Sequence, residues 1–223
     1  MFRTPRIALL AAALLLAGTA QAQSAGALIG RIGATSIQPN TKSGDLTAPS
    51  FPGTQADIGN DTQLTAGLTW MWTDNISLDL PLAAGFKHEL TGAGAIAGVG
   101  KIGEVKALPI TLLAQYRFFE PSAKLRPYVG IGPTYARFYK ARGTATLTGL
   151  TGGTPTNPTT LEMDSKLTFT AQLGLSAVLT DQLGLDVAVM TTPLKTRATL
   201  STGQTLDAKV NPTSFSVGLT MRF

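Results

Sequence analysis

The chain has 223 residues, a formal net charge of +5 and only 14% charged residues, against about 25% in ordinary soluble domains. It has no cysteine, which excludes disulfide bridges and thiolate metal sites, and it has no run of Lys or Arg that would indicate nucleic-acid binding. A low share of charge with no long apolar run after the first residues favours apolar side chains at alternating positions, as in a membrane barrel.

The N-terminal segment predicts a cleavable secretory signal peptide. Two arginines precede Ile7–Ala17, an uncharged run rich in Leu and Ala, and Ala20–Ala22 places small residues where a signal peptidase cuts. The run is shorter than the ~20 residues that a membrane-spanning helix needs, which argues against a membrane anchor. We therefore expect residues 1–22 to be removed and residues 23–223 to form an outer-membrane β-barrel.

Period-two alternation of apolar and polar residues predicts the strands. In chain order they are Ala27–Ile37, which is the least regular, then Leu64–Trp70, Ile76–Leu82, Leu108–Phe118, a strand from Arg126 onward, Lys166–Leu179, Leu183–Val189 and Phe215–Phe223. Tight polar turns join them into hairpins at 73–75, 120–125 and 180–182. Long polar stretches, which we expect to be loops, separate the hairpins at 38–62, 85–105, 140–164 and, more briefly, 195–205.

These elements predict an all-β fold, an eight-stranded antiparallel up-and-down transmembrane β-barrel with short periplasmic turns and long extracellular loops. An even number of strands lets the first and last pair, so that no edge faces lipid. Aromatic rings, which prefer the membrane interfaces, are expected in two bands. The band at the short turns would hold Trp70, Trp72, Phe118, Phe119, Tyr128 and Phe223, and the band at the loops would hold Phe86, Phe138 and Tyr139.

Four charged residues fall on the face opposite the apolar row, close to a short turn or to the C-terminus. They are Asp79, Arg117, Asp186 and Arg222. This register brings two acids and two bases together at the periplasmic end of the lumen. They either satisfy one another inside a filled small barrel, or form a plug that closes the exit, and both interpretations can hold together.

If the barrel carries a solute, one stopped by such a plug would leave through the wall, where glycine or proline weakens the strand ladder. The candidate exit positions are Pro81, Gly130, Gly132 and Pro133. Leu46 and Phe51, in the first long loop, are candidates for an apolar entrance directed inward. Phe223 ends the closing strand on the lipid face, where we expect the barrel-assembly machinery to read a terminal aromatic residue.

Two patterns that suggest enzymes do not hold up against their neighbours in the sequence. Residues 98–103 fit G-x-G-x-x-G, but a strand follows where a nucleotide-binding loop needs a helix. His88 is the single histidine, and Glu89 points to the opposite face of a strand and cannot orient it. We therefore expect no catalytic residue, no cofactor and no metal site, and a lipid-modifying hydrolase is only the third alternative for the function.

Several segments resemble the OmpW family of outer-membrane proteins. They are Thr73–Leu80, Gly85–His88, Leu108–Leu112, Lys124–Gly132 and Gly218–Phe223, and the most specific piece is Arg-Pro-Tyr-Val-Gly at 126–130. The resemblance implies a narrow hydrophobic lumen that passes small hydrophobic molecules across the outer membrane, with release sideways into the bilayer. The partners would be outer-membrane lipid, hydrophobic solutes and the barrel-assembly machinery. The alternative is a structural or adhesive barrel with a filled lumen and no transport.

Overall fold

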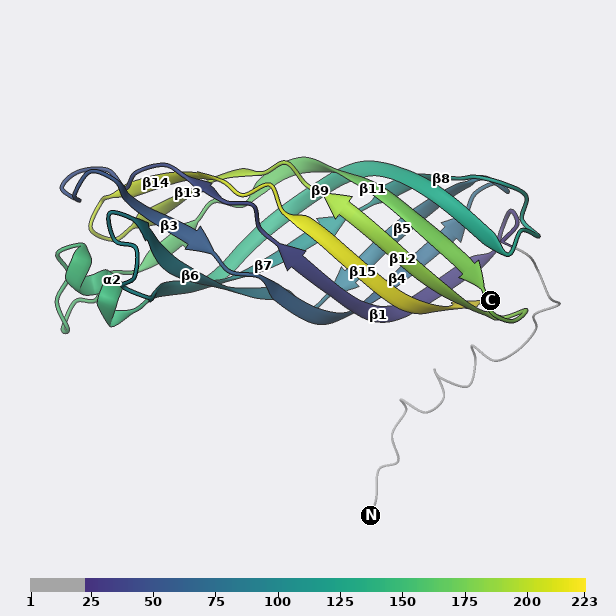
Figure 1. Ribbon diagram of the computed structural model, residues 1–223, viewed down its shortest axis with the longest axis horizontal. Coiled ribbons are helices and arrows are strands. Elements are labelled where there is room, and N and C mark those ends of the chain that lie inside the picture. The colour runs from purple at the N-terminus through teal and green to yellow at the C-terminus, as the bar shows by residue number, and fades with distance from the viewer. Residues whose placement is uncertain (1–22) are drawn as a thin grey trace, which may run out of the picture.

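The computed structural model describes residues 23–223, so the expected signal peptide lies outside the described residues. Long strands run obliquely around one axis and form a closed cylinder (Figure 1). Hydrogen-bonded neighbours follow the order β11-β12-β15-β1-β4-β5-β8-β9, and β9 pairs with β11 to complete the ring. Among the described residues, no helix is both long and apolar enough to cross a membrane.

The predicted eight-stranded antiparallel barrel is confirmed. The wall strands are β1 (Leu28–Gln38), β4 (Asp61–Met71), β5 (Ile76–Ala83), β8 (Leu113–Arg117), β9 (Leu125–Gly143), β11 (Lys166–Val178), β12 (Leu183–Thr191) and β15 (Thr213–Arg222). Short turns join β4 to β5, β8 to β9 and β11 to β12 at one end. At the closure, β1 pairs with β15 from Ile29 opposite Arg222 to Gln38 opposite Thr213, which leaves the cylinder without a free edge.

The stretches expected to be long loops contain further strands, so that expectation is wrong in part. At the end opposite the short turns lie β3 (Thr54–Ile58), β6 (Phe86–Gly94), β7 (Lys101–Thr111) and a second sheet of β10 (Leu161–Met163), β13 (Lys195–Leu200), β14 (Thr205–Lys209) and β2 (Lys42–Ser43), with the short helix α2 (Ala145–Leu150) beside them (Figure 1). These segments carry apolar residues that form a shared buried cluster, among them Ile58, Leu90 and Val105. Because the partners come from different stretches, no single stretch shows the pattern clearly.

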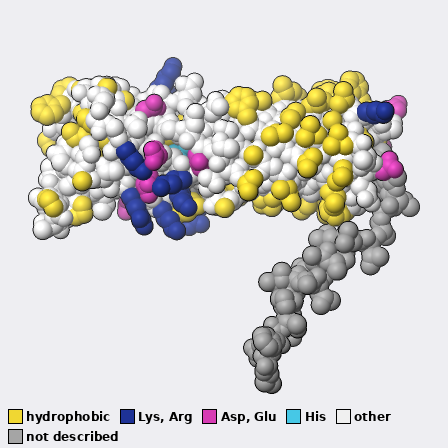
Figure 2. Space-filling model, turned by 60° about the horizontal axis from the view of Figure 1, so that its bottom comes forward, with side chains coloured by type: hydrophobic (Ala, Val, Ile, Leu, Met, Phe, Trp, Pro, Cys, Tyr) yellow, Lys and Arg dark blue, Asp and Glu magenta, His cyan; other side chains and the backbone are white. Residues whose placement is uncertain are grey.

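Side chains alternate between the outside and the lumen as the sequence predicts. In β11, Leu173 is 61% exposed whereas its neighbour Gln172 is 6% exposed. Large apolar side chains therefore face outward and polar ones inward, which is the arrangement for a barrel surrounded by lipid. Figure 2 shows the resulting apolar band, which covers the half of the visible face nearer the short turns.

Three of the nine aromatic residues expected in the interface bands lie elsewhere, and one of them, Phe138, is partly buried and lines the lumen cavity. Tyr128 and Phe86 are buried inside the cylinder, so their assignment to the bands is wrong. Tyr128 follows the inward alternation of β9, and its hydroxyl has a carboxylate partner in the lumen. Exposed aromatic residues do remain at the short-turn end, including Trp72, Phe119 and Phe223.

Candidate functional site

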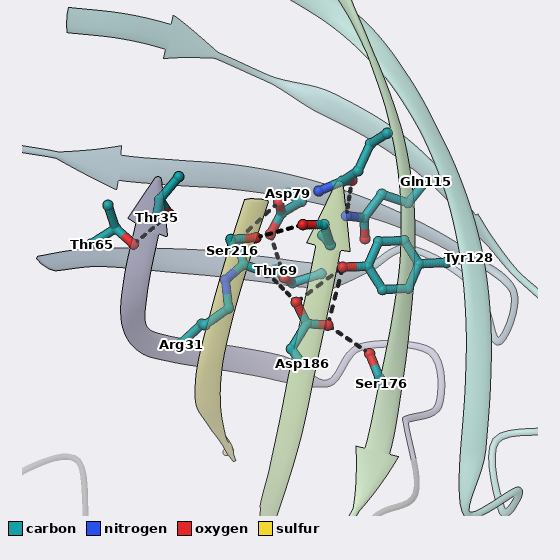
Figure 3. Close-up of polar contacts among 12 residues, drawn as sticks. Arg31, Thr35, Thr65, Thr69, Asp79, Gln115, Tyr128, Ser176, Asp186 and Ser216 are labelled. Carbon is teal, nitrogen blue, oxygen red and sulfur yellow. Dashed lines mark hydrogen bonds and ion pairs between the residues drawn. The ribbon is translucent and has the colours of Figure 1, made fainter. Parts of the chain in front are cut away.

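A layer of charged side chains crosses the lumen near the short turns (Figure 3). Arg31 of β1 donates through Nη2 to Asp79 Oδ2 of β5 at 3.3 Å and through Nη1 to Asp186 Oδ1 of β12 at 3.2 Å. The side chains are 11%, 0% and 2% exposed, respectively. Since β5 and β12 lie two strands away from β1 on opposite sides, Arg31 ties two parts of the wall together across the lumen.

Both carboxylates of this layer have further hydrogen bonds. Thr69 Oγ1 donates to Asp79 Oδ1 at 2.6 Å. Tyr128 Oη donates to Asp186 at 3.0 Å, and Ser176 Oγ donates to the same carboxylate at 2.9 Å. A buried charge is costly unless it is paired and hydrogen-bonded, and here both conditions are met for each acid.

Arg117 of β8 is the second cation of the layer. Its guanidinium donates to Ser176 Oγ at 2.9 Å and to Gln115 Oε1 at 2.9 Å, and it lies 4.7 Å from the centre of the Tyr128 ring. Ser176 therefore links Arg117 to Asp186. We call Arg31, Asp79, Arg117 and Asp186 the charge layer; its two arginines and two aspartates leave no net charge.

A third arginine closes the periplasmic end below the charge layer. Arg126 is fully buried and donates to four backbone carbonyls, at 2.8 Å to Gln23, 2.6 Å to Asp74, 3.3 Å to Phe118 and 3.1 Å to Phe119. It thereby ties the segment at Gln23 to the turns at Asp74 and Phe119, which surround the mouth. Arg126 and Tyr128 belong to the Arg-Pro-Tyr-Val-Gly segment. The most specific piece of the resemblance therefore supplies the arginine that closes the mouth and a hydrogen-bond donor to Asp186 of the charge layer.

Two glycines make room for the long side chains of the layer. A Cβ atom at Gly67 would lie 2.7 Å from Arg31 Nη2, and one at Gly174 would overlap the ring of Tyr128. Arg31 therefore lies across β4 toward Asp79, and Tyr128 lies across β11 toward Asp186. Residues with side chains at these positions would push both groups away from their partners.

The structure brings together three of the four charged residues that the sequence pointed to. Arg222 instead lies at the rim, where Nη2 donates to Thr180 O at 3.4 Å, and it takes no part in the charge layer. The cation that the expectation missed is Arg31. A signal was present, because a single arginine in the middle of a membrane-spanning strand has to face the lumen.

Two apolar cavities lie beyond the charge layer. The nearer has a volume of about 110 Å³, with Arg31 among its lining residues, and the farther has about 70 Å³ and an almost wholly apolar lining. Ile58 borders both. Leu46 lines the farther cavity, whereas Phe51 is 81% exposed and does not point inward, so the expectation that both are directed inward is corrected for Phe51.

The barrel wall is interrupted beside the nearer cavity. β5 pairs with β8 only from Ile76 to Asp79, and β6 pairs with β7 from Phe86 onward. Within the described chain, no ladder joins residues 80–85 to residues 108–112; we call this interruption the wall gap. Pro81, Ala83 and Pro109 line the cavity at the gap.

The backbone direction explains why prolines occupy this place. Donors and acceptors along an antiparallel strand point to its two neighbours in alternation. Arg117 N donates to Asn75 O, so the odd-numbered residues of β5 face the β7–β8 side. Leu112 N donates to β9, so Pro109 faces β5. The backbone nitrogens of Pro81 and Pro109 thus face the gap, and neither carries an N–H. Proline at these two places avoids two unsatisfied hydrogen-bond donors in the membrane.

The other three candidate exit residues are not at the wall gap. Gly130, Gly132 and Pro133 lie in the continuous ladder between β9 and β11, so their assignment to an exit is corrected. Gly132 permits a close approach of the backbone at Leu112, where a Cβ atom would overlap the carbonyl oxygen. Pro109 carried the same sequence signal as Pro81, a proline inside a strand pattern, and was missed.

Residues with other candidate roles are placed as follows. Phe223 lies beside the first strand, with its backbone N donating to Leu28 O at 2.8 Å, and its side chain is exposed. His88 lines the nearer cavity, and its Nδ1 lies 2.8 Å from Gly59 O. Residues 23–223 contain no group of three or more His, Cys, Asp or Glu side chains that could hold a metal ion.

The sequence and the fold are both similar to those of known outer-membrane proteins. The model of the OmpW family matches residues 24–223. Outer membrane protein W of Vibrio cholerae is 33% identical over 204 residues, which cover 88% of this chain and 88% of that protein. The crystal structure of OprG from Pseudomonas aeruginosa is 25% identical with a TM-score of 0.79, over 90% of this chain and 97% of that one. The structure of AlkL in lipid bilayers has a TM-score of 0.70 at 24% identity, over 93% and 94% of the two chains.

Proposed function

The chain belongs to the OmpW family, and we propose that it passes small hydrophobic molecules into its lumen from the cell exterior and releases them sideways into the outer membrane. The observation that carries this proposal is the wall gap. It borders an apolar cavity immediately beyond the charge layer, on the side away from the periplasm.

The chemistry of the lumen favours an apolar solute that turns aside at the charge layer. Burial of apolar surface contributes roughly 25 cal/mol per Å², and this gain is available against the cavity linings. A solute that crossed the layer would have to separate Arg31 from Asp79 and Asp186, and it would offer no hydrogen bonds in return. Exit through the wall gap leads directly to hydrocarbon and leaves the layer intact.

A filled barrel without transport is the second candidate, and the packing supplies an observation in its favour. The buried cluster that includes Leu90, Val105 and Ala136 fills the part of the lumen farther from the short turns. The nearer cavity, about 110 Å³, is smaller than the roughly 150 Å³ of an engineered cavity that holds benzene. Passage of a larger solute therefore requires side chains of this cluster to move.

The test closes the wall gap. In Pro81→Thr with Pro109→Thr, the restored N–H groups should allow β5 and β7 to pair, and uptake of an apolar fluorescent solute by vesicles that contain the protein should fall. The matched control is Pro133→Thr, a proline in an unbroken ladder, which should retain wild-type uptake. Folding of each variant is checked by the shift in gel mobility on heating.

Two results would count against the proposal. Wild-type uptake in the folded double variant would contradict exit through the gap. No acceleration of uptake by the wild-type protein over empty vesicles would favour the filled barrel. We further expect Asp79→Asn with Asp186→Asn to change the small conductance in planar bilayers more than it changes uptake of the apolar solute, because that solute does not cross the layer.

A further inference from the structure

Positive side chains gather on the outer surface just beyond the apolar band. Figure 2 shows a belt of Lys, Arg, Asp and Glu between that band and the extracellular end. Over β6, β7 and β9 it contains a recess of about 240 Å³ lined by Lys87, Glu104, Lys106, Lys140 and Arg142, together with a valine. We call these five charged residues the basic recess. Four cations less one carboxylate give it a net charge of +3.

The strand register places like charges opposite one another here. Lys87 of β6 is directly opposite Lys106 of β7, and Glu89 is directly opposite Glu104. Such pairs destabilise a sheet unless something neutralises them. The acidic pair has its counter-ion within the chain, because Lys101 Nζ lies 2.8 Å from Glu89 and 3.1 Å from Glu104.

The basic side is only partly neutralised. Lys87 Nζ lies 2.8 Å from Glu104 Oε2. Lys87 and Lys101 together lower the pKa of the Glu104 carboxyl to about 2, so this group is ionised at neutral pH and is already shared by two lysines. Arg142 stands directly opposite Glu104 in the β7–β9 register, but within the described part of the chain Lys106, Lys140 and Arg142 form no ion pair with a carboxylate.

The height of the recess identifies the region of the membrane it faces. Ile110 of β7 is exposed on the same outward face as Lys106, four residues nearer the short turns. Four residues of strand span about 13 Å along a strand tilted by about 40°, so the lysine lies about 10 Å farther from the short turns than Ile110. It stands just beyond the apolar band, where lipid head groups begin. Tyr135 of β9 is likewise exposed and lies nearer the short turns than Arg142. The short turns are periplasmic, so this edge belongs to the outer leaflet.

We propose that the basic recess binds the phosphate groups of a phosphorylated glycolipid of the outer leaflet, whose acyl chains lie against the apolar band beneath it. Lysine and arginine bind phosphate through charge-assisted hydrogen bonds. The bound phosphates supply the counter-charge that Lys106, Lys140 and Arg142 lack. The recess is open to solvent, so a free phosphate ion gains little there, whereas a lipid adds the contacts of its chains. This site is separate from the lumen and does not rest on the proposed transport.

The experiment measures binding of fluorescent lipopolysaccharide to the full folded protein in phosphatidylcholine nanodiscs. The test variant combines Lys106→Gln, Lys140→Gln and Arg142→Gln. Each basic residue near an anionic lipid surface contributes about fivefold to affinity, so the triple variant should bind on the order of 100-fold more weakly. The matched control removes three charges from the second sheet and the strand end beside it, with Lys166→Gln, Lys195→Gln and Lys209→Gln, and should bind as the wild type does.

Two further measurements identify the ligand. Wild-type protein should bind lipopolysaccharide whose phosphates have been removed about as weakly as the triple variant binds the intact lipid. Inorganic phosphate at millimolar concentration should not displace the lipid. If the triple variant folds poorly in the heat-shift assay, Arg142→Gln alone, at an exposed position, should weaken binding by about fivefold.

The proposal is overturned by any of four results. These are unchanged affinity in the folded test variant, an equal loss in the control variant, full affinity for the dephosphorylated lipid, and displacement by inorganic phosphate. An equal loss in both variants would indicate attraction by net charge alone, and displacement would indicate a site for free anions. Uptake of the apolar solute by the test variant in phosphatidylcholine vesicles should be unchanged, which separates this site from the lumen.

Discussion

Removal of the cation that joins the two acids of the lumen is expected to destabilise the barrel strongly. In Arg31→Met, a side chain of similar length loses its charge, and Asp79 and Asp186 keep their burial but lose the partner that lies 3.2–3.3 Å away. Breaking a buried ion pair by removing one member typically costs about 3–5 kcal/mol, because it leaves an uncompensated buried charge. We expect the free energy of unfolding to fall by about this amount.

The measurement is urea unfolding in phosphatidylcholine vesicles, followed by tryptophan fluorescence and by the gel shift on heating. Arg31→Met combined with Asp79→Asn and Asp186→Asn should recover most of the loss, because the neutral amides still accept from Thr69 and Tyr128. The matched control is Arg137→Met, an exposed arginine, with an expected loss below about 1 kcal/mol. A loss of less than about 1 kcal/mol in Arg31→Met, or no recovery in the combined variant, would refute the reasoning.

The remaining predictions concern packing, the depth of lipid-facing side chains, and assembly. Gly174→Val should displace Tyr128 from its carboxylate partner and cost about 1–3 kcal/mol in the same unfolding assay, and no loss would contradict the assigned contact. Leu173→Arg, at the middle of the lipid face of β11, should cost about 2–4 kcal/mol, whereas Leu179→Arg near the interface should cost about 0–1 kcal/mol; equal costs would contradict the assigned depth. Deletion of Phe223 should lower the amount of heat-modifiable barrel in outer membranes while export continues, and normal assembly would argue against its proposed role.

Local patterns determined the parts of this protein that depend on neighbours in the sequence. The alternation in β11 predicts which side chains face lipid, and the hairpin turns predict antiparallel pairing, because side-chain direction in a strand has a period of two residues. Asp79, Arg117 and Asp186 could be placed near the periplasmic end of the lumen by the same counting from the turns. The resemblance to the OmpW family, carried by short motifs, needed no tertiary information.

Only the tertiary structure decided which groups meet across the lumen and where the wall opens. Arg31 and Asp186 are 155 positions apart and their strands are not adjacent, so their ion pair depends on the stagger of the whole closed sheet. A proline in a strand reveals one missing donor, but Pro81 and Pro109 make a gap only because the register directs both toward the same interval between β5 and β7. Pro133 shows the converse, since its strand is paired along an unbroken ladder. Pairing register is a property of two strands together, and neither strand's sequence contains it.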